Sequence, residues 1–540
     1  MMRAAKNLIL PLLVIFVLAF TIRLIPVIWS PYPYNIDGLA EANFSQAIYD
    51  TGGLVPPNDA GYRDSYIVKM PFLDGLIAMF SQVVGIQPMF LAQPFIAVIG
   101  AMSCVAAALV VHMVTDSRRA SLLAGMFMAL LGTYVFCTTS VWKEALGLTM
   151  MVLIAGLFLK RSDNRIRVLL TLALLMMTFV HHHSATITYI FFIIAASGDA
   201  FLSWKSRRWS WKNSLDILTG VSLIALAEFY YRDIELPYYN FLRPETDLYL
   251  LIAVLAAMII VVFVLLSGRR ARAKRQYLKI AIPVAAIALL LLTNFRSLFT
   301  GIPTTESSVL MFGIAYAILV IPMWFGSERM LGSDQKSTSM LLAGILAPLT
   351  MILFAFLRGL DPTSHMIIYR TFDFLDLAMA VFFAGGVLIL LKNLRRAAPI
   401  FVALFLLILA TTAPLAFQTQ QLFGVQNQTY SYEVDSYQIL KSISNVTSID
   451  SDQRISTSAG SLLNFSGGSD LAYRIETGRS TLDYRWLVVE MSWTTIGAQE
   501  FPLGQRVLEG QQFADFLSGK NVILIAGPTE NQLIAATNPQ

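Results

Sequence analysis

The chain has 540 residues, of which 56% are hydrophobic and only 14% charged, and its formal net charge is +5 at pH 7. A soluble protein of this length needs more polar surface than this composition supplies, so the composition excludes an ordinary soluble protein. The basic residues stand in short loops between apolar runs, a placement that does not indicate nucleic-acid binding. With only two cysteines, the sequence also excludes a disulfide framework or a metal–thiolate site.

The apolar runs follow one another along most of the chain, starting near the N-terminus. Arg3 and Lys6 precede the first run, which continues to Trp29 without a small-residue cleavage site, so we predict an uncleaved first span. A span needs about 20 mostly apolar residues, and on this basis we expect about thirteen spans. They are Leu8–Trp29, Phe95–Val114, Ala120–Phe136, Ala145–Leu159, Val168–Val180, Ala185–Leu202, Leu215–Tyr231, Leu248–Leu266, Ile280–Phe295, Val309–Phe325, Met340–Leu357, Phe372–Leu391 and Pro399–Phe417.

The composition changes near Phe417, after which Ser, Asn, Gln, Thr and Asp dominate. We therefore predict a helical membrane domain over residues 1–417 and a globular domain over residues 418–540, which is an ordinary domain size. In the second part, Ser431–Ser444 has the spacing of an amphipathic helix with Tyr432, Ile439, Leu440 and Ile443 on one face. Asn521–Gly527 is typical of a buried strand, so the expected fold of this domain is α/β.

Basic residues indicate the orientation in the membrane. The segment 71–85 is apolar but short and contains Asp74, so we interpret it as an interfacial helix rather than a span. With that choice, clusters such as Arg118-Arg119 and Arg269-Arg270 alternate as the positive-inside rule requires, with the N-terminus in the cytoplasm. An odd number of spans then places residues 418–540 outside the cytoplasm, in a multi-pass protein of the cell membrane.

The predicted outer loop over residues 30–70 is the longest loop, and long loops in compact proteins are usually functional or disordered. Asp37 follows the first span closely, and Glu41 comes four residues later. A carboxylate at the membrane surface can serve as a general base toward a hydroxyl or bind a divalent metal. A solvated loop acid is the ordinary alternative for either residue.

A second group of outer residues includes Glu144 at the mouth of the fourth predicted span and His181, His182 and His183 at the end of the fifth. Glu144 is a candidate for a metal or substrate contact, or simply an acid favoured at a helix N-terminus. Three consecutive histidines point in different directions on a helix and cannot all bind one ion. One of them can hold a metal or a phosphate while the others cap the helix.

Basic residues on the predicted outer side oppose the positive-inside rule and are candidates for phosphate binding. Arg370 is the first candidate, and Lys143 and Arg296 are further ones. Snorkelling to lipid headgroups is the alternative explanation. Glu306 is a further outer acid without other support. Acids, histidines and cations thus gather on one face, where a phosphorylated lipid would present its headgroup.

This pattern resembles the GT-C superfamily of glycosyltransferases, which use polyprenyl-phosphate-linked sugar donors. The segments Ile36-Asp37-Gly38-Leu39-Ala40-Glu41-Ala42-Asn43 and Thr51-Gly52-Gly53-Leu54-Val55-Pro56-Pro57 are similar to the first outer loop of lipid-A aminoarabinose transferases and protein O-mannosyltransferases. The resemblance implies that Asp37 is the catalytic acid. Those enzymes often carry adjacent acids, whereas this chain has Gly38.

The number of spans and the outer C-terminal domain look more like the catalytic subunit of oligosaccharyltransferase. That resemblance places Glu144 near the second acidic motif and Arg370 near a lipid-phosphate arginine. The Trp-Trp-Asp-Tyr-Gly acceptor motif is absent, since Asp483-Tyr484-Arg485-Trp486 does not match it, and Thr304-Thr305-Glu306 matches the Thr-Ile-x-Glu motif poorly. These departures favour a monosaccharide transferase.

We therefore expect an inverting transfer of a sugar from a polyprenyl- or dolichyl-phosphate donor to an acceptor glycan, lipid or protein at the outer face. Arg370, Lys143 or a divalent metal, Mg²⁺ or Mn²⁺, would stabilise the leaving phosphate. The alternatives are an oligosaccharyltransferase-like enzyme, a lipid or sugar transporter or flippase, which would need broken helices and charges at the bilayer midplane, and a non-catalytic scaffold.

Overall fold

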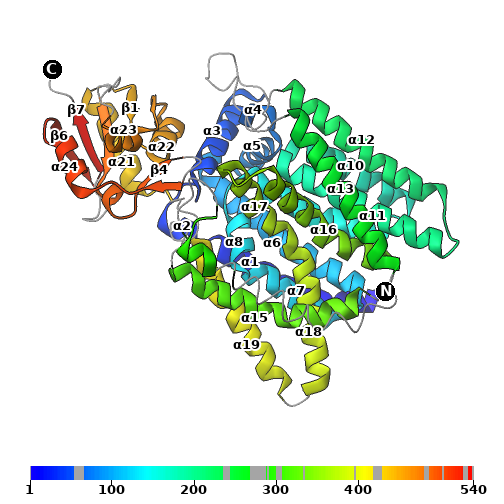
Figure 1. Cartoon of the computed structure of the whole chain (residues 1–540). Coiled ribbons are helices and arrows are strands. Elements are labelled where there is room, and N and C mark those ends of the chain that lie inside the picture. The colour runs from blue at the N-terminus through cyan, green and yellow to red at the C-terminus, as the bar shows by residue number, and fades with distance from the viewer. Residues whose placement is uncertain are drawn as a thin grey trace.

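The computed structural model describes residues 2–53, 66–234, 244–267, 288, 291–298, 304, 307–331, 335–394, 397–417, 428–444, 446–478, 486–500, 504–526 and 533–537. Figure 1 shows a large helical body and, to one side of it, a smaller unit of helices and strands formed by the C-terminal part of the chain.

The helical body begins with a long apolar helix and continues through helices of very different lengths. Its first half contains α1 (Met2–Arg23), α2 (Pro26–Trp29), α3 (Ile36–Thr51), α4 (Tyr66–Lys69), α5 (Phe72–Val84), α6 (Pro88–Thr115), α7 (Arg118–Leu130), α8 (Gly132–Thr139), α9 (Lys143–Lys160), α10 (Asn164–Val180) and α11 (His182–Lys205). Its second half contains α12 (Trp211–Asp233), α13 (Pro244–Ser267), α15 (Ser307–Met330), α16 (Gln335–Arg358), α17 (Pro362–Phe372), η2 (Asp373–Leu375), α18 (Asp376–Leu394), α19 (Ala398–Thr412) and η3 (Ala413–Phe417).

Seven helices among the described residues are long and apolar enough to cross a membrane, and an eighth span results if the bent pair α7 and α8 counts as one. This helical content makes the chain a membrane protein. Each predicted span that lies within the described residues falls on a helix, but several of these helices are shorter than a full span or broken. α7 and α8 meet at 65°, for example. The predicted span Ile280–Phe295 lies mostly outside the described residues.

Small residues let helices approach closely in the body. On α15 and α18, a methyl group added at Gly326 or Gly386 would lie 1.7 Å from a backbone oxygen of the facing helix, Phe382 O or Pro322 O respectively. Only glycine leaves room for this backbone contact, which is the usual way in which membrane helices pack without a hydrophobic driving force between them.

α5 covers the segment that the sequence predicts to be interfacial. One face of this 13-residue helix is buried against α3 and α6 and includes Leu73, Asp74 and Ile77. Its other face is apolar and exposed, with Val83 84% accessible and Met79 62% accessible. An exposed apolar face on a short helix is what contact with lipid at the membrane surface requires.

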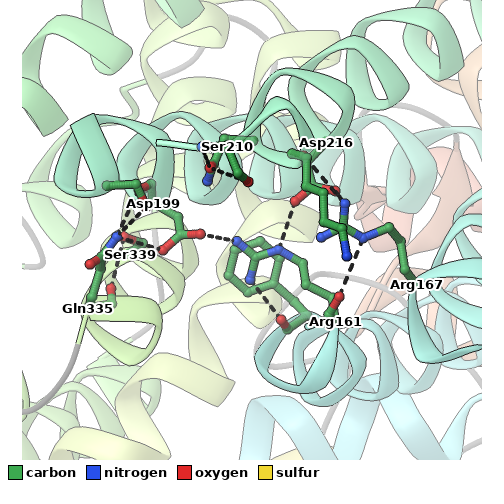
Figure 2. Close-up of polar contacts among 11 residues, drawn as sticks. Arg161, Arg167, Asp199, Ser210, Asp216, Gln335 and Ser339 are labelled. Atoms are coloured by element: carbon green, nitrogen blue, oxygen red, sulfur yellow. Dashed lines mark hydrogen bonds and ion pairs between the residues drawn. The ribbon is translucent and has the colours of Figure 1, made fainter. Parts of the chain in front are cut away.

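At the C-terminal end of α9, buried charges tie several helices together (Figure 2). The Arg161 guanidinium donates to Asp199 of α11 at 2.5 Å and to Asp216 of α12 at 3.0 Å. Arg167 of α10 lies 3.3 Å from the second oxygen of Asp216, and Gln335 of α16 donates to Asp199 at 3.1 Å. Each of the two carboxylates therefore meets more than one donor, so that the charges of this Arg161 cluster are balanced.

The C-terminal unit contains α21 (Ser431–Ser444), β1 (Ser448–Asp450), α22 (Gln453–Leu463), β2 (Ser466–Gly468), α23 (Leu471–Glu476), β3 (Trp486–Glu490), η4 (Met491–Thr494), β4 (Ala498–Glu500), β5 (Gly504–Arg506), α24 (Gly510–Leu517), β6 (Asn521–Ala526) and β7 (Leu533–Thr537). Five strands form a sheet in the order β2-β1-β3-β7-β6, with parallel pairs at the β2 end and antiparallel pairs at the β6 end. β4 and β5 form a separate hairpin.

The predicted helix over 431–444 is present as α21, and the predicted strand is present as β6 over residues 521–526. The strand was expected to be buried, but β6 stands at the end of the strand order and Val522 is 46% exposed. The buried face of α21 differs in part from the predicted one: Leu440 is buried as expected, but Ile439 is 43% exposed, and Val434 and Tyr437 are buried instead. The buried face also carries Glu433, whose carboxylate pairs with Arg454 of α22 at 2.5 Å.

The two units meet through α22, which packs against α3. Figure 1 shows α22 beside α3, at the edge of the helical body. α22 is rich in small residues, in the sequence Ser456-Thr457-Ser458-Ala459-Gly460, so its backbone can lie close to a neighbouring helix. The C-terminal unit thus supports the helix on which Asp37 lies.

Candidate active site

The start of α3 is held in place by contacts from distant parts of the chain. Asn35 accepts a hydrogen bond from the backbone N–H of Val141 at 2.7 Å, and the Tyr34 N–H donates to Gln93 at 2.9 Å. A methyl group at Gly38 would lie 2.8 Å from both the Asn35 amide oxygen and the Val141 Cβ. The crowded backbone explains why glycine rather than a second acid follows Asp37.

Asp37 lies in the first turn of α3, where the helix dipole favours a negative charge. The residue is exposed to solvent, yet the surrounding protein partly desolvates its carboxylate. This desolvation raises the pKa of Asp37; the positive charges of Arg370 and Lys143 oppose the shift, and Glu41 adds to it. A carboxylate with a raised pKa is suited to accept a proton.

One turn after Asp37 on α3, Glu41 forms a buried ion pair with Lys143, the first residue of α9. The Lys143 ammonium contacts the Glu41 carboxylate and lies 3.2 Å from Asp74 of α5, and all three side chains are at most 6% exposed. The sequence-based prediction gave Lys143 to a donor phosphate. In the structure its ammonium is enclosed by two carboxylates instead.

Glu144, in the first turn of α9, lies near Arg370 of α17. Arg370 lies in the last turn of α17 with its side chain 24% exposed, and its Nη1 is 3.9 Å from Oε2 of the buried Glu144. Neither carboxylate oxygen of Glu144 has a hydrogen-bond partner within the described part of the chain. The Arg370 guanidinium also lies near the Trp142 ring, 5.7 Å from its centre. Glu144 is thus a buried acid whose hydrogen-bonding capacity is left open.

The three histidines lie at the junction of α10 and α11. His181 caps α11, with its Nδ1 2.9 Å from the Ser184 hydroxyl, and burial lowers its pKa so that the ring is neutral. His183 meets the Thr371 hydroxyl at 3.2 Å. His182 and His183 line the cavity described next. Two of the three rings are therefore engaged in contacts that fix α11 and α17.

A mostly apolar cavity lies between α11, α12, α13, α16 and α17. Its wall carries apolar side chains such as Ile224, Leu251 and Phe354, together with Arg370. Asp37 is not among the residues that line it. Arg370 lies in the cavity wall and also interacts electrostatically with Asp37, which is outside that wall.

The acids and histidines do not fit a divalent metal site. Among the described residues, no group of three or more His, Cys, Asp or Glu side chains is placed to hold a metal ion. Glu41 and Asp74 converge on Lys143, and His181 and His183 are hydrogen-bonded to hydroxyls. The cations that the described residues place at these acids are Lys143 and Arg370.

Two predicted site residues are not brought together with the others. Arg296 is exposed and directly follows the helical residues 291–295, and Glu306 lies outside the described residues. The structure adds acids that we did not predict, namely Asp74 beside Lys143 and the buried Asp373 and Asp376 at the break between α17 and α18. Buried acids inside apolar segments are costly, and that cost was the signal available in the sequence.

Among the comparisons with known proteins, only the one with solved structures finds a match. No family model matches the sequence, and no curated protein matches it. Crystal structures of the oligosaccharyltransferase AglB from Archaeoglobus fulgidus do align with it. The apo form has a TM-score of 0.57 at 13% identity, covering 90% of this chain and 70% of that one. A complex with an inhibitory peptide and a dolichol-phosphate has a TM-score of 0.52 at 12% identity, covering 89% and 69%.

A third AglB structure, in complex with Zn and sulfate, has a TM-score of 0.52 at 12% identity and covers 89% of this chain and 68% of that one. These likenesses extend over 89–90% of this chain. The likeness shows that this chain shares the fold of the archaeal oligosaccharyltransferase, in agreement with the resemblance inferred from the sequence.

Proposed function

We propose that the chain is a membrane glycosyltransferase that moves a sugar from a polyprenyl- or dolichyl-phosphate donor to an acceptor on the extracytoplasmic side. One observation carries the proposal: Arg370 lies in the wall of an apolar cavity and also interacts with the acids Asp37 and Glu144. A phosphorylated lipid needs this combination, because its chain requires apolar surroundings while its phosphate requires a cation.

In the proposed reaction, the acceptor hydroxyl loses its proton to Asp37 as its oxygen attacks the anomeric carbon of the donor sugar. The bond between that carbon and the phosphate oxygen breaks, and the lipid phosphate leaves with the electron pair, so the anomeric configuration inverts. Arg370 stabilises the charge that develops on the leaving phosphate. The open oxygens of Glu144 are placed to accept a hydrogen bond from a substrate hydroxyl or amide.

The proposal fixes an orientation. It places the N-terminus and the Arg161 cluster on the cytoplasmic side, and Asp37 with the C-terminal domain of residues 418–540 on the other. α9 connects the two ends, with Lys143 at its start and Arg161 at its C-cap. At 1.5 Å per residue its 18 residues extend about 27 Å, close to the ~30 Å thickness of the hydrocarbon core.

The fold also favours a second candidate, transfer of an oligosaccharide to a peptide, since one AglB structure is a complex with an inhibitory peptide. The absence of the Trp-Trp-Asp-Tyr-Gly motif from the sequence speaks against it. The contact of α22 with α3 suits either candidate, because it brings the C-terminal domain next to the helix that carries Asp37.

The test is a transfer assay on purified protein in lipid nanodiscs. A panel of polyprenyl- and dolichyl-phosphate sugars is offered with glycan, lipid and peptide acceptors, and Asp37→Asn serves as the inactive reference. We expect one donor class to release free lipid phosphate together with a glycosylated acceptor. Donor binding without release from any member of the panel, combined with movement of the lipid across the bilayer, would replace the proposal by a flippase.

A further inference from the structure

Lys143 stands where three helices converge. It begins α9, while Glu41 comes from α3 and Asp74 from α5. The Lys143 ammonium contacts the Glu41 carboxylate and lies 3.2 Å from Oδ2 of Asp74. A buried charge is costly unless it is paired, and here two acids and one cation are buried together. Removing any one of the three changes the charge balance of the group.

Two carboxylates that converge on one point from different helices are a common ligand pair for a divalent cation such as Mg²⁺ or Mn²⁺. In this chain the point of convergence is filled by the ammonium of Lys143. The ammonium is held by the protein itself and supplies one positive charge rather than two.

The group also bears on the position of Asp37. Asp37 precedes Glu41 by four residues on α3, so the two side chains lie on the same face of the helix one turn apart. Lys143 interacts electrostatically with Asp37 as well. Whatever holds Glu41 to Asp74 therefore fixes the rotation of α3 and the direction in which Asp37 points.

We propose that Lys143 is the built-in cation of this site, taking the place of a divalent metal between Glu41 and Asp74 and positioning α3 so that Asp37 faces the substrate. Lys143 is a positioning residue, because the structure places it on two carboxylates rather than on the reacting groups. The proposal deepens the proposed function and rests on it only for the role of Asp37; the exchange of a lysine for a metal can be tested without any transfer assay.

The first measurement is Mn²⁺ binding by electron paramagnetic resonance on the full-length protein in detergent. Lys143→Ala opens the space between Glu41 and Asp74, and we expect this variant to bind Mn²⁺ while the wild type does not bind it there. Asp74→Asn combined with Lys143→Ala removes one ligand and should abolish that binding. Lys212→Ala, at a partly exposed lysine that donates to Asn164, is the matched control and should behave as wild type.

Two results would overturn the proposal. One is Mn²⁺ binding by the wild type that disappears in Asp74→Asn, which would show that a metal displaces Lys143. The other is folded Lys143→Ala that takes up no Mn²⁺, which would show that the two carboxylates do not form a cation site. Neither result depends on whether the chain transfers a sugar.

The second measurement is turnover in the assay described above. Wild-type turnover should be unchanged by chelation of divalent ions, and the turnover that Lys143→Ala loses should return in part when Mn²⁺ is added. A neutral triple variant, Lys143→Met with Glu41→Gln and Asp74→Asn, covers the case in which Lys143→Ala does not fold. This variant should fold, and its turnover should not respond to Mn²⁺. Its kcat should fall with little change in the KM for the donor. Full kcat in this variant would contradict the positioning role.

Discussion

The two ends of α9 carry two buried groups of charged residues that differ in how completely they are paired. At the C-terminal end, Arg161 is enclosed by Asp199 and Asp216, and both acids have further donors. At the N-terminal end, Glu144 has one cation at 3.9 Å and no hydrogen-bond partner among the described residues. Buried charges that are paired within the protein serve its stability. Buried polar groups without such partners are typical of sites where a ligand supplies the missing contact.

The N-terminal group itself contains both kinds of environment. Lys143, Glu41 and Asp74 form a closed set, while Asp37, Glu144 and Arg370 lie beside it with weaker mutual contacts. The comparison teaches that burial and charge alone do not identify a catalytic residue. The two kinds differ in how near a cation lies: Lys143 contacts Glu41 and lies 3.2 Å from Asp74, whereas the cation nearest Glu144 is 3.9 Å away. The predictions below test that difference.

The largest expected effect is on stability, at the closed end of α9. Asp216→Ala leaves Arg161 and Arg167 short of a counter-charge in a buried position, which costs about 3–5 kcal/mol for a broken buried pair. Thermal unfolding in detergent should show a correspondingly large loss, with residual folded protein still able to bind donor. Lys160→Ala, at an exposed neighbour, is the control, and an equal shift in both variants would contradict the structural role of the cluster.

The next effect is on turnover, at the open end. Asp37→Asn keeps the size of the side chain and removes its charge, so turnover should fall by ~100-fold or more, as expected for loss of a general base, with unfolding temperature near wild type. Asp50→Asn is the matched control, because Asp50 is an exposed acid on the same helix. Wild-type transfer rates in both variants would remove Asp37 from the active site.

A smaller effect is expected on donor affinity. Arg370→Ala should weaken binding of the lipid phosphate about tenfold, the equivalent of one charge-assisted hydrogen bond of about 1.5 kcal/mol. Arg232 is an exposed arginine paired with Glu228 at 2.8 Å, and Arg232→Ala serves as the control. Equal donor affinity in the two variants, measured by titration of polyprenyl phosphate, would assign Arg370 to contacts within the protein alone.

The sequence predicted the periodic and the local features of this molecule well. Apolar runs gave the helices, and the spacing of Ser431–Ser444 gave α21, because burial of one helical face leaves a pattern in the chain. The face itself was misplaced in part, and the pairing of Glu433 with Arg454 on that face is a contact between two helices that periodicity does not record.

Within the site, the sequence identified side chains but not their partners. Asp37, Glu144 and Arg370 were singled out by position, yet Lys143 was assigned to a phosphate because nothing in its neighbourhood along the chain shows that Asp74 approaches it from α5. Asp74 had served only as a reason to exclude segment 71–85 as a span. Which charges are paired is decided by tertiary packing, so a single sequence leaves that question open.

The last prediction concerns the pH dependence of transfer, where the expected effect is a modest shift. Asp37 acts as a base only when ionised, so kcat/KM should rise as the pH increases through its pKa, and desolvation places that rise above the ordinary Asp value of 3.8. The positive charge of Arg370 lowers this pKa and the negative charge of Glu41 raises it. Arg370→Gln should therefore move the rise to higher pH and Glu41→Gln to lower pH, whereas Asp50→Asn should leave it in place. A profile that moves in the same direction in the first two variants would show that the titrating group is not Asp37.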